Sequence, residues 1–470
     1  MPAFLALNGG AAVAAVAGAL ALGLGARPSA LLLAALAGYL IVVHSAVLAA
    51  GLTGHLTVSG LATVVAATAA VALWRLRRAR RDGTGPRADG EAPRAGAMAL
   101  VAPAAAVGSA VAWVWPHVVG ATRLWVWDDY TYHMVYPTLW LREHAVAAVT
   151  PPQAFTMQAW YPLSGSLVAA WYMAPFFGSR GDALAWVSLT GVLYAGIVAA
   201  GAAELLARLG CRRGAWAVPL VLLATSRRIE IMASSFSDAD LAVAAALFGA
   251  FVFAVPRGDG DAAAVTVDAG YAALLSGIAL GVKVSAVPVA VIILGMVAWR
   301  AGGVRPASRV VALFAAAWAI TGGYWYARNI VHTGNPVYPA AFLVWPGVTF
   351  PETTLLEYGR RYGLARTLGD ALAVYANWPR AHAVLAAIGL LGLGGWLIVR
   401  WRAASTPRRV FGCATLVLTA VVLGLLPTAP YSAGNAMTFR SGFVHWDSMR
   451  YVALVPILGW TALGFLLDAG

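Results

Sequence analysis

Long apolar stretches recur from one end of the chain to the other. Each runs for roughly 17 to 25 residues, the length that an α-helix needs to cross the ~30 Å hydrocarbon core of a bilayer. Of the 470 residues 61% are hydrophobic and 11% charged, which is too few charges to cover a soluble globule. Because lipid offers no hydrogen bonds to the backbone, apolar spans of this kind are helices. We therefore expect an all-α integral membrane protein.

About 13 transmembrane helices are expected, with 11 to 14 as the range. They lie near residues 4 to 24, 29 to 52, 56 to 74, 97 to 119, 181 to 207, 214 to 231, 237 to 255, 271 to 282, 285 to 299, 309 to 327, 380 to 400, 409 to 427 and 451 to 467. The two segments that flank Lys283 could instead form one kinked helix. No basic residues precede the first apolar run, so we expect it to be a retained helix rather than a cleaved signal.

Arginine clusters indicate the topology, because short arginine-rich loops stay on the cytoplasmic side. The richest, RLRRARRDGTGPRADGEAPR, also carries Gly, Pro and acidic residues and is typical of a flexible linker. It divides the chain into three additional amino-terminal helices at 1–74, a basic linker at 75–96 and a core at 97–470. Further basic segments follow Arg208, Pro256, Arg300 and Arg400. The amino terminus is then outside and the carboxyl terminus inside.

Three long stretches fall outside the cytoplasm on this map: 120–180, 328–379 and 428–450. The segment PLSGSLVAAWYMAPFFG within the first is too short to span comfortably and rich in aromatic residues, which predicts an interfacial or re-entrant helix. Against the positive-inside bias, these stretches hold many arginines: Arg123, Arg142, Arg180, Arg328, Arg360, Arg361, Arg366, Arg440 and Arg450. The arginine fork matches phosphate, so one interpretation is a phosphate cradle at the membrane surface. A solvated or headgroup-facing role is the alternative.

The net charge of +13 comes without any aromatic-basic nucleic-acid module, so anionic lipid or a phosphate-bearing substrate is the expected partner and nucleic acid is not. Lys283 is the only lysine and lies in the apolar run GIALGVKVSAVPV, where a charge costs roughly 2.5 to 3.5 kcal/mol at mid-bilayer. It either snorkels to an interface or has a partner such as a lipid phosphate. Cys211 and Cys413 lie far apart and are expected to be inert thiols.

The motif WDDYTYH at residues 127–133 follows the fourth expected helix. Asp128 and Asp129 precede His133 by four or five residues, so on a short helix all three share a face. Two carboxylates and an imidazole can hold a divalent cation, Mg²⁺ or Mn²⁺, or one carboxylate can act as a general base. Capping of the next helix is the structural alternative.

Two further polar groups lie on the same expected side. SSFSDAD, with Asp238 and Asp240, opens the seventh helix, where capping and substrate contact are equally open. FRSGFVHWDSMRY brings Arg440, His445, Asp447 and Arg450 to the outer mouth of the last helix, where they could complete a site begun by Asp128.

At these residues the chain resembles the GT-C superfamily of membrane glycosyltransferases, in particular bacterial members of the mannosyltransferase and aminoarabinose-transferase type. WDDYTYH is similar to the WDxxxYH-like motif of their first outer loop. WYPLSGSLVAAW, SSFSDADLAVAA, GIALGVKVSA, YWYARNIVHTGNPVYP and the RY of DSMRYVALVP resemble later segments. The similarity covers residues 97–470, and Asp129 is an extra carboxylate relative to the motif.

The resemblance implies an inverting transfer of a sugar from a polyprenyl-phosphate donor to an unknown glycan, lipid or protein acceptor, at the periplasmic face of a bacterial inner membrane. Asp128 would be the general base, supported by Asp129 and His133, which could also be metal ligands. The donor phosphate would be bound by Arg328, Arg450, Lys283, Asn329, Tyr338 and Arg440. The acceptor or sugar pocket would contain Tyr132, Tyr161, Asp238, Asp240, His445 and Asp447.

Other functions use the same residues. A transporter or flippase of a lipid-linked or anionic glycan would use the outer arginines and Lys283 to carry a headgroup, with no chemical change. An O-antigen-ligase-type transferase is also compatible. No repeat relates the two halves, which weighs modestly against an inverted-repeat transporter.

Overall fold

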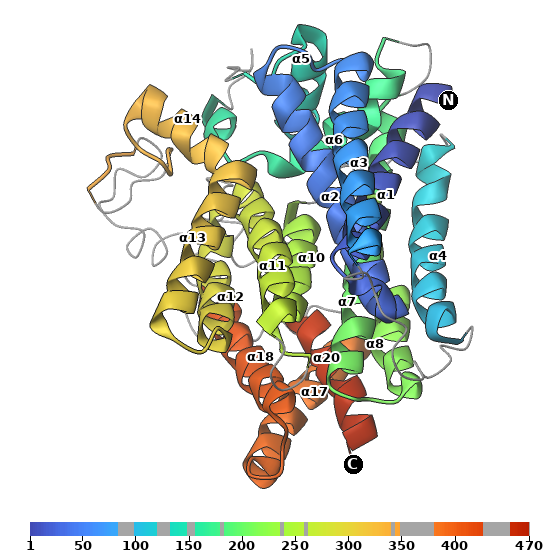
Figure 1. The fold of residues 1–470 in the computed structure, drawn as a ribbon, viewed down its shortest axis with the longest axis vertical. Helices are drawn as coiled ribbons and strands as arrows, with labels where there is room; N and C mark the ends of the chain where they lie inside the picture. The colour runs from blue at the N-terminus through green and yellow to red at the C-terminus, as the bar shows by residue number, and fades with distance from the viewer. Residues whose placement is uncertain are drawn as a thin grey trace.

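The computed structural model describes residues 1–82, 98–119, 132–147, 156–178, 183–235, 239–257, 262–339, 344–347, 380–425 and 452–469. These residues form 17 α-helices and several short 3₁₀ turns, so the expected all-α class is confirmed. The helices run mainly along the long axis of the molecule, with the amino terminus near one end and the carboxyl terminus at the other (Figure 1).

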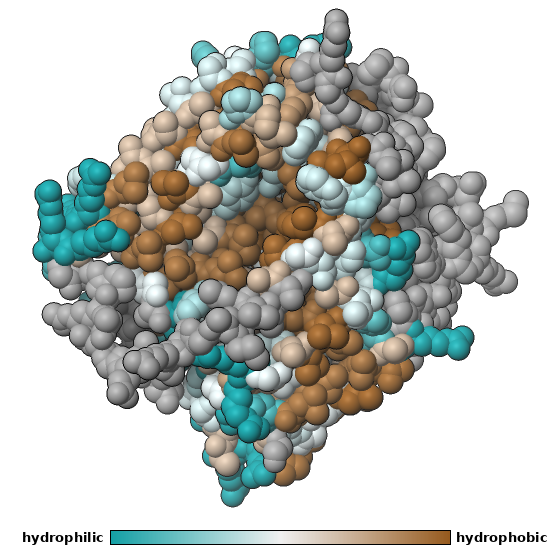
Figure 2. Space-filling view, turned by 90° about the vertical axis from the view of Figure 1, so that its right-hand side faces the viewer, coloured by the Kyte–Doolittle hydropathy of each residue, from teal (hydrophilic) through white to brown (hydrophobic). Residues whose placement is uncertain are grey.

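Seven of the described helices are long and apolar enough to cross a membrane: Pro2–Ala21, Pro28–Leu52, Val58–Arg81, Ala183–Arg208, Val265–Val282, Arg380–Arg400 and Thr406–Leu425. The number rises to nine if each of two sharply bent helix pairs is one span, Arg227–Ser234 with Ala239–Ala254 and Val304–Thr321 with Gly323–Thr333. The chain is therefore a multi-pass membrane protein by helix length and hydropathy. In one view, apolar side chains cover much of the middle of the surface, whereas hydrophilic side chains gather mostly toward its rim (Figure 2).

The expected count of about 13 spans is not reached, although a helix occurs at each of the 13 positions. Three of these helices are short: α8 (Arg213–Thr225), α12 (Val287–Arg300, extended by a 3₁₀ turn from Val284) and α20 (Leu454–Ala469). The span expected at 309–327 is broken by 68° between α13 (Val304–Thr321) and α14 (Gly323–Thr333). The break falls at Gly322 and Gly323, and paired small residues are a usual cause of kinks.

The helices on either side of Lys283 are separate rather than one kinked helix. Lys283 has an extended backbone (φ −155°, ψ 131°) between α11 (Ala262–Val282) and the turn into α12. Arg300 at the far end of α12 returns to Asp268 near the start of α11, which requires an antiparallel pair. Helix α11 also begins nine residues before the expected position, at Ala262, so that Asp268 lies within a helix and not in a cytoplasmic loop.

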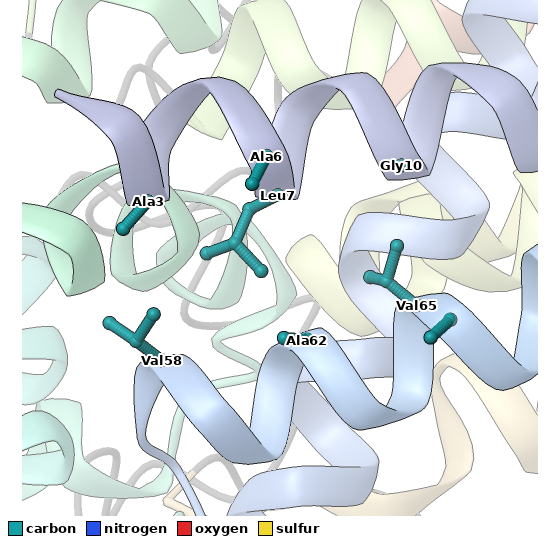
Figure 3. A pocket seen from close by; sticks show the side chains of 8 residues that line it. Ala3, Ala6, Leu7, Gly10, Val58, Ala62 and Val65 are labelled. Carbon is teal, nitrogen blue, oxygen red and sulfur yellow. The ribbon is translucent and has the colours of Figure 1, made fainter.

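Three amino-terminal helices pack together. Helix α1 (Pro2–Ala21) packs along α3 (Val58–Arg81), and α2 (Pro28–Leu52) joins this pair to the core by packing on α6 (Ser164–Met173) and α7 (Leu189–Arg208). A small apolar groove of about 170 Å³ lies between α1 and α3, lined by residues such as Leu7, Gly10 and Val65 (Figure 3). It offers no polar side chain to a ligand.

Helix α3 continues to Arg81 instead of ending near residue 74. The first residues of the expected linker, Arg75 to Arg81, are therefore helical. Arginine is a good helix former, and positive charge in the last turn interacts favourably with the helix dipole.

Helix α6 was expected to lie in the headgroup zone or to re-enter the membrane. All ten of its residues are buried, and it packs against α2, α11 and α5 (Val135–Glu143). A helix covered on every side faces protein rather than lipid headgroups, and whether it lies in the interface or re-enters the membrane stays a prediction. The polar side chains at this end of the bundle lie around helix α6.

Candidate functional site at the Arg328 end of the bundle

Arg328 projects from α14, the short helix beyond the glycine break. Only 6% of the residue is exposed, and its guanidinium lies over the rings of Trp160 and Trp325, 5.5 and 5.1 Å from their centroids. Its Nε and Nη2 donate to the Asn329 side-chain oxygen at 3.2 and 3.0 Å, and Nη2 also reaches the Tyr161 carbonyl at 3.5 Å. Among the described residues Arg328 has no carboxylate partner, and its Nη1 makes no hydrogen bond.

Asn329 fastens the surrounding loops. Its Nδ2 donates to the backbone carbonyls of Trp160 at 2.9 Å, Tyr338 at 3.2 Å and Pro336 at 3.3 Å, while its side-chain oxygen accepts from Arg328. The amide thereby holds the Arg328 guanidinium in place, and its contact with phosphate stays a prediction. Tyr338 packs its ring edge-on against Trp160, with centroids 5.6 Å apart.

Tyr132 and His133, the last two residues of WDDYTYH, lie against the start of α6. The Tyr132 ring meets Tyr161 edge-on at 5.8 Å, and the buried His133 places Nδ1 3.3 Å from the Ser166 hydroxyl. The Tyr161 backbone carbonyl in turn accepts the bond from Arg328. Residues 132, 133, 161 and 328, which the sequence assigns to one site, are therefore neighbours.

Lys283 has a protein partner. Its Nζ donates to the Asp240 carboxylate at 2.5 Å, and the two side chains are 31% and 8% exposed. This contact explains how the only lysine of the chain is tolerated between apolar helices, and it gives Asp240, in the first turn of α10 (Ala239–Ala254), a role beyond helix capping. A lipid phosphate is not needed to compensate Lys283.

Ser164, at the start of α6, joins these groups into one arrangement. Its hydroxyl accepts a hydrogen bond from Trp325 Nε1 at 2.9 Å and lies 3.0 Å from His44 Nε2 of α2. A Cβ atom on Gly281, two residues before Lys283, would come within 2.3 Å of the Ser164 oxygen, so only glycine fits there. We call Tyr132, His133, Tyr161, Ser164, Asp240, Lys283 and Arg328 the Arg328 cluster.

Several expected site residues lie outside the described residues: Asp128, Asp129, Asp238, Arg440, His445, Asp447 and Arg450. The proposed base and five of the expected donor or acceptor contacts are among them. Their roles stay predictions.

The described residues do not fit a metal centre by themselves. No group of three His, Cys, Asp or Glu side chains gathers anywhere among them. His133 turns Nδ1 to a serine hydroxyl, and the two carboxylates expected beside it belong to the undescribed part of the motif.

Sequence reasoning missed the residues that hold the site together. Trp160, Trp325, Ser164, Ser166 and His44 carry no signal of their own, because a buried serine or tryptophan in an apolar run is indistinguishable from any other core residue. His44 is fully buried and comes from the amino-terminal helices, which the resemblance did not cover.

A second charged group, also missed, lies toward the opposite end, where the basic loops are. Arg208 donates to both Glu204 (2.9 Å) and Asp268 (3.2 Å), and Arg257 and Arg300 reach Asp268 at 2.6 and 3.4 Å. Arg27, just before α2, reaches Glu204 at 3.5 Å. We call these six residues the arginine cluster. It binds together the ends of α7, α10, α11 and α12.

The cysteines are as expected. Cys211 and Cys413 are both free, and burial raises the pKa of the Cys211 thiol to about 11. Such a thiol carries little thiolate at neutral pH and is a poor nucleophile or metal ligand.

The arrangement at the Arg328 end thus offers a buried guanidinium between aromatic rings, a lysine–carboxylate pair and a histidine, all around one buried helix. Neither a protein-family model, nor a curated protein, nor a solved structure shows a significant match to this chain.

Proposed function

We propose that this protein is an inverting glycosyltransferase that moves a sugar from a polyprenyl-phosphate donor to an acceptor outside the cytoplasm. The observation that carries the proposal is Arg328, a buried guanidinium with no carboxylate partner among the described residues and an unused donor edge. A desolvated cation of this kind is costly unless a ligand supplies the counter-charge, and a fork of N–H donors suits a phosphate oxygen.

The chemistry needs a base and a stabilised leaving group. The acceptor hydroxyl attacks the anomeric carbon as Asp128 takes its proton, and the bond from that carbon to the phosphate oxygen breaks, leaving the electron pair on the phosphate. Arg328 then faces an anion whose charge has increased, which favours the transition state over the ground state. The aromatic rings of Tyr132 and Tyr161 are suited to packing against a sugar face. Asn329 and Trp160 keep the Arg328 fork in place.

The test of the site uses polyprenyl phosphate as the probe, with the full chain in nanodiscs. Arg328→Gln should weaken binding about 10- to 100-fold, because charge-assisted hydrogen bonds contribute roughly 1.5 to 3 kcal/mol. Arg328→Lys keeps the charge without the fork and should fall between. Arg142→Gln is the matched control, because Arg142 is an exposed arginine on the neighbouring helix α5. Among the described residues its partner is Glu143. Equal binding by Arg328→Gln and Arg142→Gln would remove the phosphate role of Arg328.

The test of the chemistry uses a radiolabelled polyprenyl-phosphate mannose or aminoarabinose donor with membranes that supply acceptors. Asp128→Asn should abolish sugar transfer while polyprenyl-phosphate binding persists. Retained turnover in that variant would overturn the assignment of the base. A transporter predicts instead that the labelled lipid crosses the liposome bilayer unchanged, and that outcome would replace the transferase proposal.

A further inference from the structure

The arginine cluster holds more positive charge than it can neutralise internally. Its ion pairs join four guanidinium groups to two carboxylates, Glu204 and Asp268, so two positive charges remain uncompensated by the described residues. Arg208 is fully enclosed, with both carboxylates and the Val255 carbonyl (2.7 Å) around it. The excess must therefore be carried by the other arginines.

Exposure within the cluster is graded. The side chains of Arg27 and Arg257 are 36% and 19% exposed, whereas those of Arg300 and Arg208 are 6% and 0% exposed. The Nε of Arg257 is buried and makes no hydrogen bond to the described residues, so one donor of this guanidinium has no acceptor among them. Burial lowers the pKa of Arg27, although the neighbouring Glu204 carboxylate opposes this shift.

The position of the cluster indicates the source of that anion. It lies at the ends of α7 and α11, two helices long and apolar enough to span a membrane, and beside the basic loops that the positive-inside bias assigns to the cytoplasmic face. Basic side chains at the cytoplasmic ends of membrane-spanning helices attract anionic lipid headgroups.

We propose that the arginine cluster is a binding site for the phosphate of an anionic phospholipid headgroup, with Arg27 and Arg257 as its contacts. The site lies at the other end of the bundle from the Arg328 cluster and does not depend on the proposed transferase activity. The positive charges of Arg300 and Arg208 add to the electrostatic attraction for the phosphate. The two carboxylates hold the guanidinium groups apart and fix their orientation. A zwitterionic headgroup, whose own cation would face Arg27, is disfavoured.

The variants can be chosen so that folding survives. Without Arg27, Glu204 keeps Arg208 Nε at 2.9 Å and the Ser29 hydroxyl at 2.9 Å. Without Arg257, Asp268 keeps Arg208 and Arg300. Arg27→Gln and Arg257→Gln are therefore independent tests, and Arg305→Gln, an exposed arginine at the start of α13, is the matched control.

The full chain, purified with each substitution, is equilibrated with phosphatidylglycerol or phosphatidylcholine, and retained lipid is counted by native mass spectrometry. We expect the parent and Arg305→Gln to retain phosphatidylglycerol in preference to phosphatidylcholine, and Arg27→Gln and Arg257→Gln each to weaken that retention about tenfold. Retention equal to that of Arg305→Gln in both variants would overturn the proposal. Displacement of phosphatidylglycerol by millimolar inorganic phosphate would also overturn it, because free phosphate would then be the occupant.

Discussion

The two charged regions of this protein treat buried arginine in opposite ways. In the arginine cluster, Arg208 has two carboxylates and a backbone carbonyl within hydrogen-bonding distance. In the Arg328 cluster, Arg328 has an amide oxygen, a carbonyl and two aromatic rings, and no carboxylate among the described residues. A guanidinium that is saturated by protein acceptors holds helices together, whereas one left short of an anion carries a desolvation cost that an anionic ligand would offset. Burial alone does not distinguish them, but the charge of their partners does.

The largest effect on stability should come from Asp268. Asp268→Asn leaves Arg208, Arg257 and Arg300 without their shared anion, and breaking a buried ion pair in this way costs about 3 to 5 kcal/mol. We expect a large fall in the thermal unfolding midpoint in detergent. A midpoint within error of the parent would mean that the arginine cluster does not stabilise the bundle, and the contrast between the two regions would disappear.

The next largest effect should come from Ser164. Ser164→Ala leaves Trp325 Nε1 and His44 Nε2 buried without their shared partner, a loss of about 1 to 3 kcal/mol. Because Trp325 also lies under Arg328, polyprenyl-phosphate binding should weaken as well. Ser166→Ala, two residues further along the same buried helix, is the comparison. It removes the longer 3.3 Å contact to His133 and should lower the free energy of unfolding by less. The reverse order of the two unfolding midpoints would argue against Ser164 as the centre of the site.

Arg328 itself should contribute little to stability. Arg328→Met removes the cation–π contacts, each about 2 kcal/mol for a desolvated cation, but it also removes a buried charge that no carboxylate among the described residues balances. We expect the unfolding free energy to change by less than about 1 kcal/mol, in either direction, while phosphate-lipid binding is lost. Destabilisation as large as that of Asp268→Asn would place Arg328 in the same structural class as Arg208.

The smallest effect belongs to the exposed outer arginine. Arg142 is 66% exposed and pairs with its neighbour Glu143 at 3.3 Å, a surface contact of about 0 to 1 kcal/mol before screening by salt. Arg142→Gln should leave both the unfolding midpoint and polyprenyl-phosphate binding unchanged. A clear loss of binding would show that the outer arginines act collectively through their field and not through one buried fork.

The sequence alone does not distinguish buried from exposed arginines on the expected outer side. The sequence places Arg142 and Arg328 on one expected side of the membrane, and both lie in polar surroundings. The glycine break before α14 and the burial of α6 leave Arg328 buried among aromatic rings and Arg142 at the surface. No local pattern encodes that difference, because it depends on which helices pack around each side chain.

For Lys283 the sequence indicated the need for a partner but did not identify the partner. Its position in an apolar run correctly required a partner or an interface. The partner, Asp240, is 43 residues away in the chain, and the sequence left its role open between helix capping and substrate contact. Helix length was harder to judge than helix position, because hydropathy measures apolar content while glycine breaks such as Gly322–Gly323 and early starts such as Ala262 are set by packing.

The sequence by itself determined that this chain is an all-helical membrane protein and where most of its helices lie. Hydropathy and charge are local, and the bilayer responds to them residue by residue. Only the tertiary structure decided that residues 132, 161, 283 and 328 gather around one buried helix, and that six charged residues from distant helices form a cluster toward the opposite end. Those contacts join segments far apart in the chain, so they exist only once the helices have packed.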